Sequence, residues 1–439
     1  MRLFIKNGIV IDPSQKLHAK KDLWIENGKI KKIAPPGTLD KEILRGFAPQ
    51  DDRQARNDKI IDAKNCIVAP GFIDMHTHLR EPGDEHKETI HTGAKAAARG
   101  GFTSVVCMAN TTPANDNPFI TQFIKLKAQE EACVNVYPVG ALSKGLKGEE
   151  LAEIGSLKEA GCVAISDDGH PVMNSYVMRK ALDYCKHFKL PIISHCEDSH
   201  LVGKGMINEG LRSTILGLRG NPATSEEIMV ARDIALAELT GSHVHMAHIS
   251  TQAAVRLIAD AKKRKVPVSC EVTPHHLFLT DESVATYNTH FKMAPPLRTP
   301  KDIAALKKGL KENVIDSFST DHAPQGVLEK NIEFEEAANG VIGLETALPI
   351  TLKLVEEKVL TLSQFIEKWT LAPARILSLP KGTLKIGADA DITIFDPTKK
   401  IKITSDTFVS KSKNTPFHGW TVKGKVVATV VGGKIVYPF

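Results

Sequence analysis

The sequence lacks the marks of a membrane, secreted or nucleic-acid-binding protein. Its 439 residues contain no apolar run of about eighteen, the length that indicates a transmembrane helix. The start, Met1 to Lys6, lacks the three parts of a signal peptide, which are a basic segment, an apolar stretch and a small-residue cleavage site. Lys and Arg number 57 against 51 Asp and Glu, a small and dispersed excess. We therefore expect a cytoplasmic protein that binds neither membranes nor nucleic acid.

Cysteine is also scarce. The 7 cysteines are scattered, odd in number and contain no Cys-x-x-Cys pair. This usage indicates reduced, structural thiols and argues against a disulfide framework or a cysteine-ligated zinc. The remaining composition, 42% hydrophobic and 25% charged, is that of a soluble globular protein. The length allows one large α/β barrel and a smaller domain.

Both ends of the chain have the pattern of short strands joined by tight turns. In residues 3–33 the β-like runs are broken at Asn7-Gly8 and Asn27-Gly28, which are strong hairpin signals. Residues 390–437 repeat this pattern, with a turn at Gly432-Gly433. The similarity predicts that the two ends pair with each other.

These patterns predict the domain organisation. We expect residues 1–66 and 380–439 to form one small β-sandwich domain. The polar stretch 35–59, with three Pro and two Gly, is interpreted as a surface insertion in that domain. Residues 67–379 form the second, larger domain.

In this larger domain, apolar runs of strand length alternate with helix-length amphipathic segments such as 224–240 and 253–261. The alternation is typical of repeated βα units around a parallel sheet. Eight runs qualify as core strands: Ile67–Met75, Thr103–Met108, Val134–Val139, Val163–Ser166, Pro191–Ser194, His243–Ala247, Val266–Val272 and Val314–Ser319. Eight strands fit a closed barrel, so the predicted fold class is α/β, a (β/α)₈ TIM-like barrel.

Polar residues gather where these apolar runs stop. In a (β/α)₈ barrel the carboxyl ends of the strands converge on one face, which carries the active site. Six strand ends therefore predict one site, built from His76, His78, Arg80, Asn110, Asp167, Asp168, His195, His248 and Asp321.

The pair His76 and His78 has a period of two, so both imidazoles leave the same side of an extended strand and can bind one ion. Together with His195, His248 and Asp321, they predict a metal site. Imidazoles and carboxylates suit zinc, as one or two ions, with manganese or cobalt as substitutes.

A cation held in this way lowers the pKa of a water bound to it, which supports hydrolysis of an amide or ester. Asp321 has the character of a proton shuttle between that water and a leaving nitrogen. Arg80 lies on the same face as His78, and its planar fork suits a substrate carboxylate. His243 and His245, by contrast, are interpreted as packed, hydrogen-bonded barrel residues.

The stretch from Asp74 to Gly83, DMHTHLREPG, resembles the first signature of the dihydroorotases in the amidohydrolase superfamily. Further stretches similar to that family follow in the family's order: 108–111, 166–172, 194–197, 245–250, 319–324, 343–346 and 414–419. The resemblance implies a (β/α)₈ barrel with a β domain built from both chain ends.

The resemblance also implies roles for the site residues. His76, His78 and Asp321 would bind one metal, and His195 and His248 a second, with a bridging ligand between them. In hydantoinases, allantoinases and one dihydroorotase class this bridge is a carbamylated Lys, whereas the long-chain bacterial class uses an Asp.

The corresponding stretch, Val163–Asp168, contains no Lys, which favours the Asp-bridged class. Asp168 is our first choice for the bridge and Asp167 the alternative. Arg80 and Asn110 resemble the family's ligands for the substrate's carboxylate.

Two positions depart from the family's pattern. Ala294 stands before Pro-Pro-Leu-Arg, where the family commonly has an Asn that contacts the pyrimidine ring. Gln325 stands where a substrate-contacting His is usual. Gln325 keeps a donor and an acceptor and remains a predicted substrate ligand, whereas Ala294 offers neither.

The resemblance implies a zinc-dependent dihydroorotase, which cyclises N-carbamoyl-L-aspartate reversibly to (S)-dihydroorotate with release of water in de novo pyrimidine (UMP) biosynthesis. Two alternatives remain open: another cyclic amidase of hydantoinase or allantoinase type, and a catalytically silent dihydroorotase-like subunit that supports aspartate transcarbamoylase. A homodimer and an association with aspartate transcarbamoylase are the partners considered.

Overall fold

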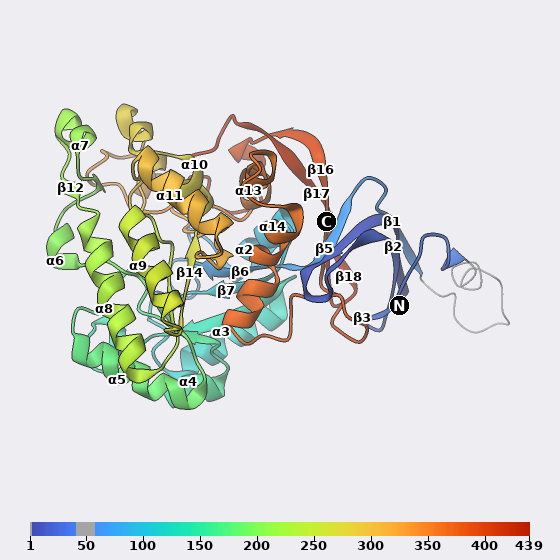
Figure 1. The fold of residues 1–439 in the computed structure, drawn as a ribbon, viewed down its shortest axis with the longest axis horizontal. Coiled ribbons are helices and arrows are strands. Elements are labelled where there is room, and N and C mark those ends of the chain that lie inside the picture. Colours follow the sequence, from blue (N-terminus) through green and yellow to red (C-terminus); the bar gives the residue numbers. More distant parts are fainter. Residues whose placement is uncertain (1, 41–57) are drawn as a thin grey trace.

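The computed structural model describes residues 2–40 and 58–439 and confirms the predicted fold class. One parallel sheet forms a barrel, and a second sheet is built from both chain ends and lies beside it, at the right in Figure 1. Both termini lie at this second sheet (Figure 1). Most of the predicted insertion at residues 35–59 falls outside the described residues.

The barrel contains all eight predicted strand regions, each pairing in parallel with the next along the chain. In barrel order the strands are β6 (Phe72–Thr77), β7 (Phe102–Cys107), β8 (Asn135–Gly140), β9 (Ala164–Ile165), β10 (Ile192–Ser194), β13 (Val244–Met246), β14 (Val268–Val272) and β15 (Ser317–Phe318). The last strand returns to the first through a parallel bridge between Thr77 and His322, and the His78 amide donates to the His322 carbonyl at 2.8 Å. The ring is thus closed at its carboxyl end.

The predicted strand Ile67–Met75 is two strands. Its first part, β5 (Ile67–Pro70), pairs with the strands of the chain ends, and only its second part, β6, belongs to the barrel. Gly71 separates them, and a Cβ there would lie 2.0 Å from Thr103 Oγ1, so the chain passes between the two sheets where only glycine fits. Because both parts are fully buried, the apolar run in the sequence gives no sign of this switch.

The chain-end sheet joins eight strands by hydrogen bonds in the order β18-β17-β16-β5-β1-β2-β3, with β4 also paired to β1. Its strands besides β5 are β1 (Arg2–Asp12), β2 (Leu17–Glu26), β3 (Lys29–Ala34), β4 (Lys59–Asp62), β16 (Ile392–Lys402), β17 (Thr421–Val431) and β18 (Lys434–Tyr437). Ile5, Ile25, Val68, Ile394 and Val430 share one buried cluster, so strands from both ends of the chain enclose a common core.

Helices surround the barrel (Figure 1). They are α2 (Ile90–Gly100), α3 (Pro118–Glu131), α4 (Ile154–Ala160), α5 (Ser175–Phe188), α6 (Ser199–Val202), α7 (Leu211–Leu216), α8 (Thr224–Thr240), α9 (Gln252–Lys263), α10 (Pro274–Phe278), α11 (Pro300–Lys311), α12 (Val327–Lys330), α13 (Ala347–Glu356), α14 (Leu362–Trp369) and α15 (Leu371–Ile376). The predicted helix 224–240 is α8, which ends at Gly241 in the left-handed conformation. The predicted helix 253–261 is α9, whose N-cap Thr251 accepts from the Ala254 amide.

Two short strands, β11 (Ile207–Asn208) and β12 (Gly220–Asn221), pair with each other outside both sheets. Single 3₁₀ turns complete the described structure: η1 (Pro13–Gln15), η2 (Lys144–Leu146), η3 (Asp281–Thr286), η4 (Thr289–Phe291) and η5 (Ser405–Thr407).

An aromatic cluster packs α14 against the barrel strands and the chain-end sheet. Trp369, at the end of α14, is fully buried, with its ring 5.1 Å from that of Phe102 and 5.2 Å from that of Phe318. Phe72 stacks on Trp369 and also contacts Phe395 of β16 at 6.0 Å. Aromatic burial of this kind dominates core energetics, so it fixes the barrel against the chain-end sheet.

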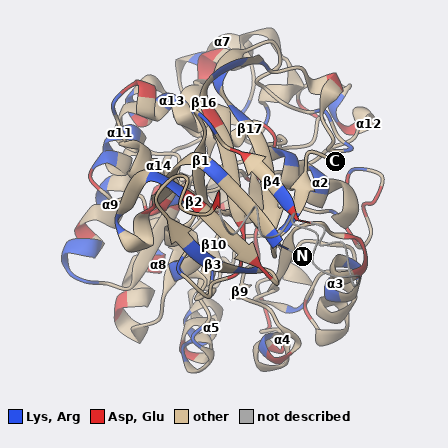
Figure 2. Ribbon diagram, turned by 90° about the vertical axis from the view of Figure 1, so that its right-hand side faces the viewer, with Lys and Arg blue, Asp and Glu red and all other residues tan. Residues whose placement is uncertain are grey.

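Charge of both signs covers the exterior. Figure 2, which views the molecule from the side of the chain-end sheet, shows blue Lys and Arg and red Asp and Glu distributed over the surrounding helices. In residues 2–40 and 58–439, no helix has both the length and the apolar character needed to span a bilayer.

Candidate active site and metal centre

Six predicted site residues gather where the barrel strands end. We call them the His–Asp cluster: His76, His78, Asp168, His195, His248 and Asp321. His76 lies in β6, and the other five follow the ends of β6, β9, β10, β13 and β15. Each of the six is less than 10% exposed. The convergence of strand ends predicted from the sequence is therefore present in the structure.

Asp168 lies at the centre of the cluster. Its Oδ1 is 3.3 Å from Nε2 of His76 and 3.6 Å from both Nδ1 of His195 and Nε2 of His248. Its Oδ2 is 3.5 Å from Nε2 of His78. Two groups of potential metal ligands share this carboxylate, one with His76 and His78 and the other with His195 and His248.

Asp167, the alternative bridge, is turned away from the cluster. Its Oδ1 accepts from the backbone amides of Leu142 at 2.7 Å and Ser143 at 3.0 Å, and the Ser143 hydroxyl donates to its Oδ2. Burial raises the pKa of this carboxyl, and those hydrogen bonds offset only part of the effect. Asp167 therefore anchors the loop after β8, and Asp168 is the one of the pair that contacts the histidines.

Asp321 completes the group around the paired histidines. Its Oδ1 lies 3.1 Å from Nε2 of His78 and 3.7 Å from Nε2 of His76. Burial alone would raise the pKa of Asp321, but the contact with His78 and the charges of His76 and His248 outweigh it and lower that pKa. The carboxyl group is thus held ionised, ready to accept a proton.

Three predicted site residues have a strained backbone. Arg80, His248 and Asp321 have φ values of 61°, 31° and 46°, a left-handed conformation that is uncommon outside glycine. Such strain persists only where the surrounding structure enforces it, and it concentrates at functional sites. All three residues stand just past the end of a barrel strand.

The cluster has the properties of a cation site. Nε2 of His76 and Oδ1 of Asp168 are buried and have no hydrogen-bond partner among the described residues. Burial opposes a charged imidazole at His195, yet Asp168 and Glu197 raise the pKa of His195 to about 10. The carboxylates thus draw positive charge into a buried space, and a divalent ion would supply it without protonating the ligands. The residues present fit a metal ion.

Asn110, a predicted substrate ligand, lies behind His78. Its side-chain oxygen accepts from Nδ1 of His78 at 2.8 Å, and its Nδ2 donates to the Asp168 carbonyl at 3.3 Å. Since Nδ1 of His78 donates to Asn110, its Nε2, which faces the cluster, is the ring nitrogen that would bind a cation. In the structure Asn110 therefore orients a histidine of the cluster.

The two remaining predicted substrate ligands, Arg80 and Gln325, form what we call the Arg80 side. Arg80 donates from Nε to the Pro324 carbonyl at 3.1 Å, and its two terminal nitrogens have no hydrogen-bond partner within the described chain. Gln325 donates from Nε2 to the Asn339 carbonyl at 2.8 Å, while its buried Oε1 has no such partner there. The Arg80 side thus offers two donors and one acceptor to a ligand.

Three buried residues that the sequence interpretation missed support these groups. Glu271, in β14, lies 2.9 Å from Nδ1 of His76. Asp74, in β6, accepts from the amides of His76 and Thr320. Asn414 donates to the carbonyls of Ala323 and Gly340 and accepts from the Gln325 amide, which fixes the loop after β15. The available signal was a single acidic residue inside a fully buried strand, as at Asp74 and Glu271.

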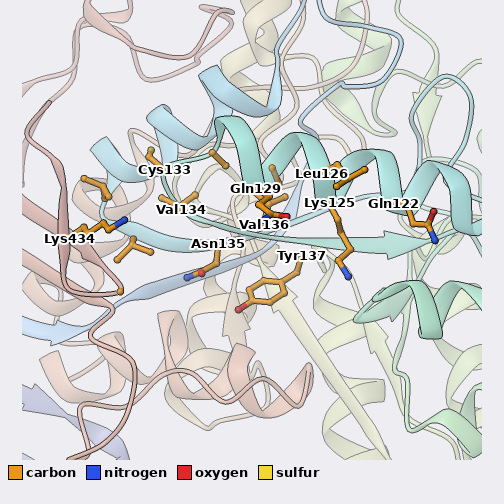
Figure 3. Close-up of a pocket in the computed structure, with 15 residues that line it drawn as sticks. Gln122, Lys125, Leu126, Gln129, Cys133, Val134, Asn135, Val136, Tyr137 and Lys434 are labelled. Carbon is orange, nitrogen blue, oxygen red and sulfur yellow. The ribbon is translucent and has the colours of Figure 1, made fainter. Parts of the chain in front are cut away.

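A cavity of about 950 Å³ lies elsewhere, at the opposite end of the barrel strands. It is lined by α3, the start of β8 and the hairpin β17–β18, and Figure 3 shows Lys125, Tyr137 and Lys434 around it. None of the predicted site residues lines it. Its position excludes it as the site formed by the strand ends.

Comparison with solved structures defines the class of fold. L-Hydantoinase (dihydropyrimidinase) from Arthrobacter aurescens superposes with a TM-score of 0.85 at 24% identity, covering 99% of this chain and 95% of that one. The chain therefore has the same fold as that hydantoinase, and the match covers both the barrel and the chain-end sheet.

Sequence comparison identifies the family. A family model described as "Dihydro-orotase-like" matches residues 65–254. The dihydroorotase of Syntrophus aciditrophicus (strain SB) is 51% identical over 437 residues, covering 100% of this chain and 99% of the relative. The dihydroorotase of Geotalea daltonii (strain DSM 22248 / JCM 15807 / FRC-32) is 52% identical with the same coverage. The chain belongs to the dihydroorotase family.

Proposed function

We propose that this chain is a dihydroorotase that interconverts N-carbamoyl-L-aspartate and (S)-dihydroorotate, with water released on ring closure, in pyrimidine biosynthesis. The observation that carries this proposal is identity of about half of all residues with dihydroorotases over the full length of both chains. Conservation of the whole chain includes the barrel and the chain-end sheet, so the similarity is not confined to a shared fold.

Zinc is the proposed cofactor. His76 and His78 would hold one ion and His195 and His248 a second, with Asp168 shared between them and Asp321 beside the first pair. A bound divalent cation would lower the pKa of water and polarise the amide carbonyl. The donor set of imidazole nitrogen and carboxylate oxygen is that of zinc, with manganese and cobalt as substitutes.

The protein's own residues perform the remaining steps. Arg80 binds the substrate carboxylate through its two unpartnered terminal nitrogens. Asp321 accepts the proton of the attacking water during hydrolysis and delivers it to the ring nitrogen that leaves. In ring closure the same carboxyl group returns the proton in the opposite direction. Gln325 accepts from a ring N–H at its free Oε1.

The direct test is an assay of the purified, zinc-loaded protein in both directions. Ring opening exposes a second carboxylate and releases a proton, so low pH must favour closure and high pH must favour opening. Hydantoin and allantoin serve as control substrates, since an amidase of that type needs no partner for Arg80. Turnover of hydantoin without turnover of dihydroorotate would contradict the proposal.

The test also addresses the silent-subunit alternative. A protein that binds zinc but turns over dihydroorotate only after aspartate transcarbamoylase is added would favour a supporting subunit. The proposal includes a homodimer and an association with that enzyme, on the strength of the family resemblance, and light scattering of the protein alone and mixed with it measures both. Its 7 cysteines are all free thiols, which supports a cytoplasmic location.

A further inference from the structure

A row of polar side chains in contact with one another runs through the interior of the barrel beneath the His–Asp cluster. Barrel interiors are usually filled by branched apolar residues. Here the inward positions of two neighbouring strands are polar: His243 and His245 at β13, and Ser269 and Glu271 on β14. Glu271 and His245 are 0% exposed, and Ser269 is 5% exposed. The amidase chemistry proposed above does not use any of the four.

Contacts join the four residues to the cluster in a single line. Oε1 of Glu271 lies 2.9 Å from Nδ1 of His76, and its Oε2 lies 3.2 Å from Nε2 of His245. Nδ1 of His245 lies 2.7 Å from the Ser269 hydroxyl, which is also 2.8 Å from Nε2 of His243. The line runs from the carboxyl end of the barrel towards its amino end.

The chemistry of these groups limits the direction of these contacts. A carboxylate only accepts, so His76 carries its hydrogen on Nδ1. Nε2 of His245 is in ion-pair contact with Oε2 of Glu271 at 3.2 Å, without a hydrogen bond in the described chain. With its hydrogen on that side, His245 accepts from the Ser269 hydroxyl at Nδ1. The Ser269 oxygen is left to accept from Nε2 of His243.

The charge of His243 agrees with this direction. Burial and the nearby His245 lower the pKa of His243 to about 4, so its imidazole is neutral at pH 7. A neutral ring supplies one donor, as the line requires.

We propose that Glu271, held by His245, Ser269 and His243, is a positioning residue that fixes His76 as the Nδ1–H tautomer and aims its Nε2 lone pair at the cation. A metal-binding histidine usually donates its other N–H to an outer partner, and loss of that partner typically weakens metal binding 10- to 100-fold. The inference rests on the proposed metal site. It adds a determinant of zinc affinity inside the barrel, remote from the substrate.

The experiment compares zinc affinity in Glu271→Gln and in a matched control. Asp12→Asn makes the same kind of change at another fully buried carboxylate, which accepts from the amides of Ser14 and Leu384 in the chain-end region. The metal is removed with a chelator, and zinc is returned in competition with a chromophoric chelator. The ligand-field spectrum of Co²⁺-loaded protein reports the geometry of the ligands separately from activity.

We expect Glu271→Gln to weaken zinc binding about 10- to 100-fold and to alter the Co²⁺ spectrum, with both unchanged in Asp12→Asn. Folded Glu271→Gln with wild-type affinity and spectrum would overturn the positioning role alone. Wild type that binds neither metal would instead overturn the metal site of the proposed function. If Glu271→Gln does not fold, His245→Gln decides: a smaller loss of affinity supports the role, and unchanged affinity refutes it.

Discussion

The His–Asp cluster and the Arg80 side differ in how much of their hydrogen-bonding capacity the protein itself uses. In the cluster, His76 and His78 are each fixed from behind, by Glu271 and Asn110. On the Arg80 side, two guanidinium nitrogens and the oxygen of Gln325 have no partner in the described chain. A preorganised half of this kind would suit a tightly held ion, whereas the unsatisfied hydrogen-bonding groups of the Arg80 side would suit a ligand that binds and leaves.

The largest effect is expected at the carboxylate that both histidine pairs share. Asp168→Asn removes the charge common to the two groups, whereas Asp167→Asn removes a charge that only anchors a loop. Losses of outer partners alone cost about 10- to 100-fold, so we expect Asp168→Asn to lose more than 100-fold in activity together with most of its metal. Metal analysis and steady-state kinetics measure both quantities.

The neighbouring variant is the control for that test. Asp167→Asn should keep its metal content and lose mainly stability, because its amide still accepts from Leu142 and Ser143. The reverse outcome, metal lost from Asp167→Asn and kept by Asp168→Asn, would show that Asp167 and not Asp168 is the bridging residue.

The next effect concerns proton transfer at Asp321. Asp321→Asn keeps the shape of the side chain but cannot accept a proton, and positioned general acid–base groups contribute about 10²–10⁴-fold. We expect kcat to fall by that factor in both directions of the reaction. Near-normal turnover at unchanged metal content would remove the shuttle role.

On the Arg80 side the expected effect is smaller. Arg80→Lys keeps the charge but loses the planar fork, and one charge-assisted hydrogen bond is worth about 1.5–3 kcal/mol. The value of kcat/KM for dihydroorotate should therefore fall about 10- to 100-fold, with metal content unchanged. A variant as active as wild type would show that another group anchors the carboxylate.

The sequence could predict the eight strands and the cluster for one reason. Each strand is an apolar run, six of these runs end in polar residues, and barrel geometry brings the strand ends together whatever lies between them. It could not separate β5 from β6, because both are apolar and the change of sheet takes place at a single glycine, Gly71.

The orientation of side chains was the other part that the sequence could not give. Asp167 and Asp168 are consecutive, and which of them faces the histidines depends on the loop conformation after β9. Glu271 was visible as an acidic residue in a strand, but its contact with His76 joins two strands that are not neighbours, since β15 lies between them. Such contacts are set by packing and leave no local pattern.

In the row of polar side chains beneath the cluster, the buried His243 predicts an acid-dependent loss of stability. The unfolded chain binds a proton at His243 below about pH 6.5, and the folded chain only below about pH 4 because of burial. Between these values the unfolded state holds more protons, so the contribution present above pH 6.5 is lost as the pH falls towards 4. Over the whole window the size is at most about 3 to 4 kcal/mol.

Denaturant unfolding at pH 7.5 and pH 5 measures this loss, with chelator present so that metal release does not contribute. His243→Gln keeps a donor for Ser269 but does not titrate. We expect the free energy of unfolding to fall less on acidification in this variant than in wild type. Equal losses in the two proteins would contradict a buried, neutral His243.

The smallest effect is expected at Gln325. Changing this residue tests whether the substrate uses its unsatisfied acceptor, Oε1. Gln325→Leu has about the same size but offers no acceptor, and a neutral hydrogen bond is worth about 1 kcal/mol. That corresponds to about a fivefold loss. Since the contact is made to bound substrate as well as in the transition state, the loss should appear in KM with kcat nearly unchanged. Gln325→Glu separates this contact from the fold: it keeps an acceptor but places a negative charge beside an anionic substrate, so KM should rise more than in Gln325→Leu. Equal KM values in wild type and both variants would mean that Oε1 of Gln325 does not touch the substrate, which would leave the Arg80 side with the arginine alone.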